Sequence, residues 1–154
     1  MKVVIDASVV LKGFFADEEG HNEAQEIFKD YALGILSLSA PILLSYEITN
    51  GVLQALKRRR IEKMRAKEIL KEFEALEIPL QIVGLEEILE IAQAYQRSAY
   101  DAAYLALAQK EGVEFITGDK RLYNAVKDRL PWVKWVENYQ PVGKRGLKSR
   151  GINP

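Results

Sequence analysis

The chain of 154 residues contains no cysteine and a single histidine, His21. A disulfide framework and a zinc site built on thiolates are therefore excluded, and so is a metal site built on several imidazoles. A chain without cysteine suits a reducing compartment, so we expect a cytoplasmic protein. If the chain binds a metal ion, the ligands must be mainly oxygen atoms.

Long apolar runs and an excess of charge are also absent. No stretch approaches the ~18–20 apolar residues of a membrane span, and the apolar part of the N-terminus is too short for a signal peptide, so we expect no membrane association. The 22 basic and 22 acidic residues give a formal net charge of zero, but residues 142–154 carry four basic residues and no acidic one. We therefore expect one domain over residues 1–140 and a basic, glycine-rich tail over residues 141–154, of a composition common in flexible segments.

Short β-rich apolar runs alternate with longer helical patterns along the chain. Strands are predicted at residues 2–6, 35–39, 80–84, 113–117 and 132–136. Helices are predicted at residues 7–15, 19–34, 41–59, 61–76, 85–96, 98–108 and 119–130. This alternation predicts an α/β fold in which a mostly parallel central sheet lies between helices, a three-layer α/β/α sandwich. Such sheets bind their ligands beyond the carboxyl ends of the strands.

Two acidic residues come directly after predicted strands. Asp6 ends "VVID", and Asp119 follows the strand in "FITGDKRL". In a parallel sheet both would emerge at the same edge, where ligands are expected. Each also precedes a helical segment, so each has an alternative role as a helix N-cap.

Two further acidic residues lie in helices next to apolar faces. Glu47 borders the apolar stripe of the helix at residues 41–59, although a glutamate there could also reach solvent. Asp101 shares a helical face with Leu105 and Ala108 in "SAYDAAYLALA". Its alternative role is a favourable charge in the first turn of a helix that Ser98 caps.

Together these four acidic residues predict a metal site. Four carboxylates within a few ångströms of one another repel strongly and need a counter-charge. Oxygen ligands of this kind suit Mg²⁺ or Mn²⁺. Such an ion activates water and neutralises charge on a scissile phosphate.

Four ordered segments resemble the signature segments of the PIN domain family, and most closely those of the VapC-type toxin ribonucleases. They read "VVIDASVVLKGFF", "PILLSYEITNGVL", "SAYDAAYLALAQKEG" and "FITGDKRL". The resemblance extends from Met1 to about Val136. It implies an α/β/α sandwich with Mg²⁺ or Mn²⁺ at the sheet edge, hydrolysis of phosphodiester bonds in single-stranded RNA, an antitoxin protein as partner, and a homodimer.

The resemblance also assigns residues to the site. The catalytic and metal-binding set it implies consists of Asp6, Glu47, Asp101 and Asp119. Ser8 and Thr117 match supporting hydroxyls, and Asn50 matches a frequent asparagine, with an ordinary helix-surface amide as its alternative. Two other functions remain open: a PIN nuclease that processes RNA without an antitoxin, and a PIN-like module that binds RNA or protein without cutting.

Basic and aromatic residues close to these segments have two interpretations each. Residues 56–67 carry seven basic residues and one acidic one, and form either a solvated surface or a contact with RNA phosphates. Tyr46, Tyr100 and Tyr104 neighbour the acidic residues, and belong either to the core or to a surface that stacks on bases.

Overall fold

The computed structural model describes residues 1–145 and contains a five-stranded parallel sheet with strand order β3-β2-β1-β4-β5. The strands are β1 (Lys2–Ile5), β2 (Ser37–Pro41), β3 (Leu80–Gln81), β4 (Glu114–Thr117) and β5 (Val133–Trp135). The first seven helices are α1 (Ala7–Phe14), α2 (His21–Ala32), α3 (Leu44–Lys57), α4 (Lys63–Ala75), α5 (Leu85–Tyr95), α6 (Ala99–Glu111) and α7 (Lys120–Val126). The predicted alternation of strands and helices is confirmed.

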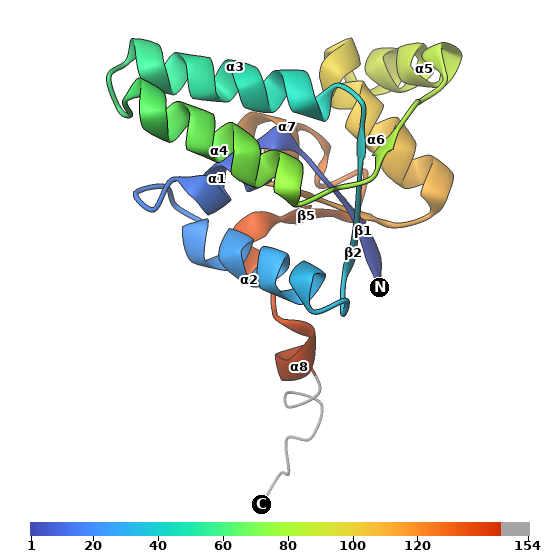
Figure 1. Cartoon of the computed structure of the whole chain (residues 1–154). Coiled ribbons are helices and arrows are strands. Elements are labelled where there is room, and N and C mark those ends of the chain that lie inside the picture. Colours follow the sequence, from blue (N-terminus) through green and yellow to red (C-terminus); the bar gives the residue numbers. More distant parts are fainter. Residues whose placement is uncertain (146–154) are drawn as a thin grey trace, which may run out of the picture.

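The order of the strands explains the layers. The chain passes from β1 outward to β2 and β3, then returns to β4 and continues to β5 on the other side of β1. Right-handed crossovers that run in opposite directions place α1 to α4 on one face of the sheet and α5 to α7 on the other. Figure 1 shows α2, α3 and α4 on one side of β1 and β2, and α5 and α6 on the opposite side. The predicted three-layer α/β/α architecture is therefore confirmed.

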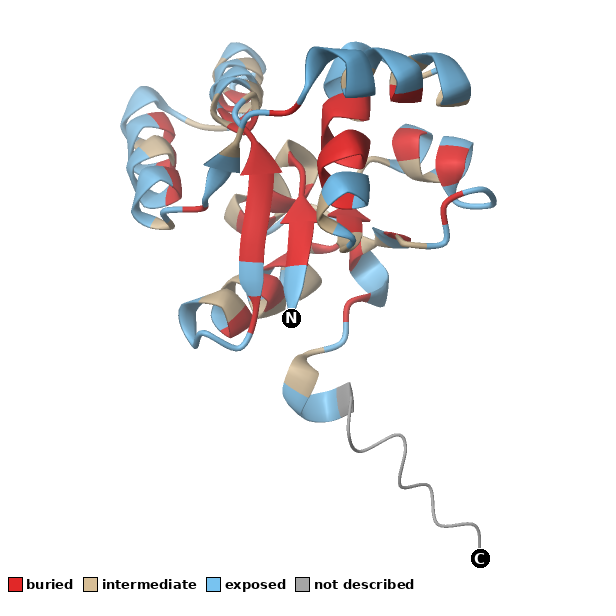
Figure 2. Ribbon diagram, turned by 90° about the vertical axis from the view of Figure 1, so that its right-hand side faces the viewer, coloured by how far each residue is buried: buried red, intermediate tan, exposed pale blue. Residues whose placement is uncertain are grey.

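The buried centre of the molecule is the sheet together with α6. β1 and β2 are buried except at their first residues, and Figure 2 shows these two strands buried up to an exposed end. All seven residues from Ala102 to Ala108 are buried, because α6 packs on β1, β2 and β4 and is covered by α5. Small side chains let the helix approach the strands closely, and Asp101 lies at its exposed amino-terminal end.

Among the predicted boundaries that differ from the structure, two are wrong for a common reason. Pro41 was expected to open the long helix, but it ends β2, and α3 begins at Leu44. The backbone N–H that proline lacks is the one that would point toward β1, so the β1–β2 ladder stops at Ser39. The strand expected at residues 80–84 is limited to β3, because its partner β2 ends at Pro41.

One face of α4 packs into the core. Ile69 and Phe73 are buried, and Ile69 packs with Val52 and Phe15 in a small second core between α3, α4 and the end of α1.

The C-terminal part of the described chain adds two short elements that the sequence did not predict. They are the 3-10 turn η1 (Val136–Asn138) and the helix α8 (Val142–Arg145). Asp30, buried on α2, accepts hydrogen bonds from the Tyr139 hydroxyl at 2.6 Å and from the Val142 backbone N–H at 3.2 Å. These bonds attach this segment to α2. The rest of the predicted tail, residues 146–154, lies outside the described residues.

Candidate active site

Four elements bring the four predicted acidic residues to one edge of the sheet. Asp6 follows β1 and Asp119 follows β4, and these strands are direct neighbours. Glu47 and Asp101 lie in the first turns of α3 and α6. The charge of Asp119 raises the pKa values of the other three carboxyl groups, which shows that all four share one electrostatic environment.

The capping roles that the sequence offered as alternatives are also present. Asp6 accepts a hydrogen bond from the Val9 backbone N–H at 3.2 Å, and Ser98 accepts one from the Asp101 N–H at 3.1 Å. Asp119 accepts from the N–H groups of Arg121 and Leu122, both through Oδ1. Capping therefore uses one carboxylate oxygen, Oδ1, of Asp6 and of Asp119, and does not involve the second oxygen of either residue.

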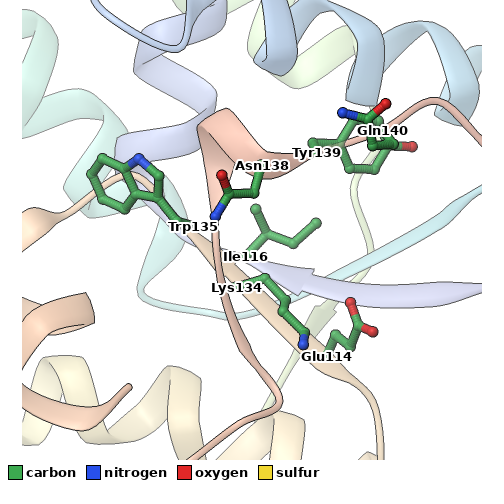
Figure 3. A pocket seen from close by; sticks show the side chains of 7 residues that line it. All are labelled: Glu114, Ile116, Lys134, Trp135, Asn138, Tyr139 and Gln140. Carbon is green, nitrogen blue, oxygen red and sulfur yellow. The ribbon is translucent and has the colours of Figure 1, made fainter. Parts of the chain in front are cut away.

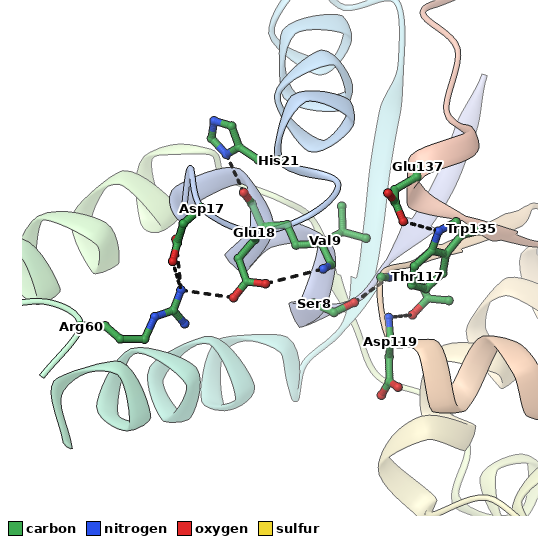
Figure 4. Close-up of polar contacts among 12 residues, drawn as sticks. Ser8, Val9, Asp17, Glu18, His21, Arg60, Thr117, Asp119, Trp135 and Glu137 are labelled. Atoms are coloured by element: carbon green, nitrogen blue, oxygen red, sulfur yellow. Dashed lines mark hydrogen bonds and ion pairs between the residues drawn. The ribbon is translucent and has the colours of Figure 1, made fainter. Parts of the chain in front are cut away.

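Asp6 is held at both oxygens by the two predicted supporting hydroxyls. Ser8 Oγ donates to Oδ1 of Asp6, and Thr117 Oγ1 donates to Oδ2. The same hydroxyls accept from the next loop: Gly118 N–H donates to Ser8 at 2.8 Å, and Asp119 N–H donates to Thr117 at 3.0 Å. Figure 4 shows Ser8, Thr117 and Asp119 in this arrangement. The two hydroxyls thus connect the loops after β1 and β4 and fix the orientation of Asp6.

Burial makes Asp6 a weaker acid than an exposed aspartate. Its side chain is almost fully buried, and this burial raises the pKa to about 6 from an ordinary value of 3.8. Hydrogen bonds from Ser8, Thr117 and Val9 oppose the increase, and the charge of Asp119 adds to it. A carboxylate kept in such a place is costly in the absence of a cation.

Glu47 has a hydrogen-bond partner, Tyr104, that its sequence position alone does not predict. The Tyr104 hydroxyl donates to Glu47 Oε1 at 2.6 Å, and the Tyr104 ring stacks on Phe115 with centroids 5.8 Å apart. Tyr104 is buried, so its core interpretation is correct. Burial raises the pKa of Glu47, the Tyr104 bond opposes this, and the charges of Asp101 and Asp119 add to it. The available signal was the position of Tyr104, one turn after Asp101.

Asp101 is paired with a cation, Arg97, which the sequence analysis did not single out. Arg97 Nε lies 3.4 Å from Asp101 Oδ2, four residues away in the chain. The Nε atom is buried and has no hydrogen-bond partner within residues 1–145. Burial and the charge of Asp119 raise the pKa of Asp101, whereas Arg97 lowers it.

Replacing Arg97 with glutamine is expected to raise the pKa of Asp101 further. The substitution removes the nearby positive charge and leaves burial and the charge of Asp119 unopposed. The titration of the Asp101 side-chain carboxyl carbon, followed by NMR in EDTA, measures this directly. Arg65→Gln is the control, because Arg65 pairs with Glu68 and Glu72 of its own helix α4. An unchanged or lower midpoint for Asp101 in Arg97→Gln would contradict the assigned role.

The chemistry of the four side chains fits a hard divalent cation. All the candidate ligand atoms are carboxylate oxygens, and three of the four carboxyl groups have pKa values raised by burial and by mutual repulsion. Within residues 1–145, however, no three histidine or acidic side chains are arranged so that they could hold an ion together. Asp6 is engaged by hydroxyls and Asp101 by Arg97, so a cation bound between the acids would require these side chains to change partners.

Asn50 and two tyrosines surround a hollow beside this edge. The hollow has a volume of about 500 Å³, and its lining includes Glu47, Asn50, Tyr46 and Tyr100. Tyr46 and Tyr100 are exposed, so the core interpretation is wrong for these two residues.

A second hollow, of about 330 Å³, lies along β4 and β5 and contains none of the four acidic residues. Figure 3 shows Trp135 and Asn138 at one end of it and Lys134 beside Glu114 at the other. Because this hollow lacks all four acids, it is not part of the predicted site.

The basic residues 56–67 are partly neutralised within the molecule. Arg60 lies over the Phe15 ring. It also pairs with Asp17 and Glu18, as Figure 4 shows. Arg65 pairs with acidic residues of its own helix. The exposed cations Lys57, Arg58 and Arg59 have no ion pair within the described part of the chain.

Membrane insertion has no support in the described helices. Within residues 1–145, none combines the length and the apolar character that crossing a bilayer demands.

Comparisons with known proteins agree with this architecture. Ribonuclease VapC3 of Pyrobaculum aerophilum is 29% identical over 126 residues, covering 79% of this chain and 92% of that protein. Ribonuclease VapC9 of Mycobacterium tuberculosis is 29% identical over 131 residues, covering 84% and 94%.

Two solved structures share the fold. The protein PAE2754 of Pyrobaculum aerophilum matches with a TM-score of 0.66 and 21% identity, covering 89% of this chain and 93% of that one. VapC20 of Mycobacterium tuberculosis, described as a toxin that cleaves the sarcin-ricin loop, matches with a TM-score of 0.55 and 16% identity, covering 80% and 94%. A family model described as the PIN domain matches residues 3–128. Because this match spans most of the chain, the protein belongs to the PIN domain family.

Proposed function

We propose that this protein is a divalent-metal-dependent endoribonuclease that hydrolyses single-stranded RNA, and that it is the toxin of a toxin–antitoxin pair. The observation that carries the proposal is the convergence of Asp6, Glu47, Asp101 and Asp119 from four elements of a PIN fold. The names of the VapC relatives support ribonuclease activity and the toxin role. We also propose a cytoplasmic location, an antitoxin partner and a homodimer, as the resemblance to VapC-type toxins implies.

The four acidic side chains have different roles in this proposal. Asp6, Asp101 and Asp119 bind the cation, and Ser8 and Thr117 fix the orientation of Asp6. Bound there, Mg²⁺ or Mn²⁺ supplies positive charge to the scissile phosphate and lowers the pKa of water.

Glu47 orients the attacking water and accepts its proton, because a carboxyl group with a raised pKa is a better base. Tyr104 holds the Glu47 carboxylate in place through its 2.6 Å hydrogen bond. The water oxygen forms a bond to phosphorus, and the bond from phosphorus to the leaving oxygen breaks.

A binding module that does not cut RNA explains the site less well. Three buried or half-buried acids with raised pKa values reduce the stability of the fold, and a module that only binds has no use for them. A nuclease that processes RNA without an antitoxin has the same site, so the neighbouring reading frame distinguishes it from a toxin. Finding a short upstream frame that encodes a DNA-binding N-terminus and an apolar tail would support the toxin role.

The proposed activity is tested with the purified wild-type protein and a pool of fluorescent single-stranded RNA. We expect cleavage with Mg²⁺ or Mn²⁺ and none in EDTA, because the carboxylates need the cation to act on an anionic substrate. Gel analysis of the products, beside single-stranded DNA of the same sequences, measures both the activity and the substrate class. Cleavage that persists in EDTA, or no cleavage with either metal, would contradict the proposal.

A further inference from the structure

The hollow beside Glu47 is flanked by two tyrosine rings that the proposed chemistry does not use. The side chains of Tyr46 and Tyr100 are 78% and 67% exposed. Neither side chain makes a hydrogen bond or a ring contact within residues 1–145. Two large aromatic side chains thus stand in solvent at the edge that carries the acidic residues.

The position of these rings follows from the sequence. Each tyrosine directly precedes an acidic residue in the first turn of its helix: Tyr46 precedes Glu47, and Tyr100 precedes Asp101. Successive residues of a helix point about 100° apart. When Glu47 and Asp101 face the shared edge, the rings therefore stand beside it and not within it. The arrangement places one ring from α3 and one from α6 next to the acids.

The exposed face of α3 continues from this hollow toward positive charge. Tyr46, Asn50, Leu53 and Lys57 are all exposed and follow one another at intervals of four, three and four residues. That spacing keeps them on one helical face, over a length of about 16 Å. At its far end Lys57 joins Arg58 and Arg59, whose charges are not paired within the described residues.

A single-stranded nucleic acid matches this distribution of groups. Its bases need flat apolar surfaces, and its phosphates need cations. Stacking accepts any base, because every base has a π-face, whereas basic residues bind the backbone. A peptide has no regular alternation of flat rings and negative charges to match such a surface.

We propose that Tyr46 and Tyr100 form a stacking platform for the bases next to the scissile phosphate. From this platform the RNA strand follows the exposed face of α3 to Lys57, Arg58 and Arg59. The inference rests on the proposed function for its substrate, single-stranded RNA. It assigns this hollow as the place where the substrate is held during cleavage.

The test combines RNA binding with steady-state kinetics. Binding of a fluorescent 12-nucleotide single-stranded RNA is measured by anisotropy in EDTA, so that binding is separated from cleavage. Tyr46→Leu and Tyr100→Leu are each expected to weaken binding by about tenfold. In the presence of metal, both substitutions raise KM more than they lower kcat. Tyr46→Phe and Tyr100→Phe keep the rings and are expected to retain the affinity within about twofold.

Two controls separate stacking from charge and from loss of fold. An RNA of the same length without bases at its centre should bind the wild-type protein as weakly as intact RNA binds the leucine variants. Lys57→Gln should reduce the slope of log affinity against log salt concentration by about one, whereas the tyrosine variants should leave this slope unchanged. Leu33→Ser removes a similarly exposed apolar side chain near the amino-terminal ends of the strands. This variant should change neither the RNA affinity nor KM.

The outcomes distinguish this inference from the proposed function. RNA binding that depends on the tyrosine rings, without cleavage, supports the platform and overturns the nuclease. Cleavage with an unchanged KM in both leucine variants overturns the platform and supports the nuclease. Absence of RNA binding by the wild type overturns the platform. So does a change of oligomeric state in the leucine variants without a change in RNA affinity, because the rings then cover a second copy of the chain.

Discussion

Asp101→Asn is expected to reduce metal-dependent RNA cleavage at least about a hundredfold, because the variant loses an ionised ligand that no other side chain replaces. Asp101 is half-buried at the start of α6. Its carboxylate pairs with Arg97 and is repelled by the charge of Asp119. Asparagine has nearly the same shape, and its backbone N–H still donates to Ser98. The helix start should therefore remain intact while the charge is lost.

The measurement compares initial cleavage rates of the wild type and the variant, prepared identically, over a range of Mg²⁺ concentrations. Asp128→Asn is the matched control: it makes the same chemical change at an exposed position after α7. Its rate should equal that of the wild type. Equal rates for Asp101→Asn and the wild type would contradict the assignment of Asp101 to the site.

The metal-free protein is expected to lose stability as the pH rises from about 4 to 7. Asp6 has a folded-state pKa of about 6, above its ordinary value of 3.8. Between these values the folded protein binds a proton that the unfolded chain releases, so the free energy of unfolding falls as the pH increases through this range. The shift corresponds to about 3 kcal/mol for Asp6 alone. Glu47 and Asp101, whose pKa values are also raised, change stability in the same direction.

Urea denaturation in EDTA at several pH values measures this loss. Asp6→Asn should greatly reduce the pH dependence of the free energy of unfolding. Because asparagine has no charge to bury and can still cap α1, the metal-free variant should be more stable than the wild type at pH 7. Asp128→Asn should follow the wild type. At pH 7, Mg²⁺ at about one hundred times its Kd should restore about 2.7 kcal/mol in the wild type. A wild type whose stability increases from pH 4 to 7 in EDTA would refute the assignment of Asp6 as a buried, weak acid.

These two expectations describe one physical conflict. The carboxylates that we propose bind a cation are the groups that destabilise the metal-free fold, through burial of Asp6 and repulsion from Asp119. Ser8 and Thr117 reduce this cost by donating to Asp6. A site that is unfavourable when empty is stabilised by its ligand, which links metal binding to stability.

Much of the fold and the position of the acids could be predicted from the sequence, because the signals are local. Apolar periodicity distinguishes strands from helices within about ten residues. An aspartate that ends a strand and caps the next helix, such as Asp6 or Asp119, needs only its neighbours to be identified. The parallel topology then places both at one edge, because neighbouring parallel strands end on the same side.

The groups that surround the acids depended on tertiary packing. Tyr104 meets Glu47 across 57 residues of sequence, and Thr117 meets Asp6 across 111. Pro41 ends a strand instead of starting a helix because β1 lies on the side where its N–H is missing. No local sequence pattern predicts these contacts, because they form only when helices pack on a sheet.

The sequence by itself thus determined the order of elements, the capping aspartates and the candidate ligands. Only the tertiary structure decided that Tyr104 is buried against Phe115, whereas Tyr46 and Tyr100 stand exposed beside a hollow. The reason is physical: periodicity and capping act over one or two turns of chain. The burial of a given side chain is set by the elements that pack against it, and these come from distant parts of the sequence.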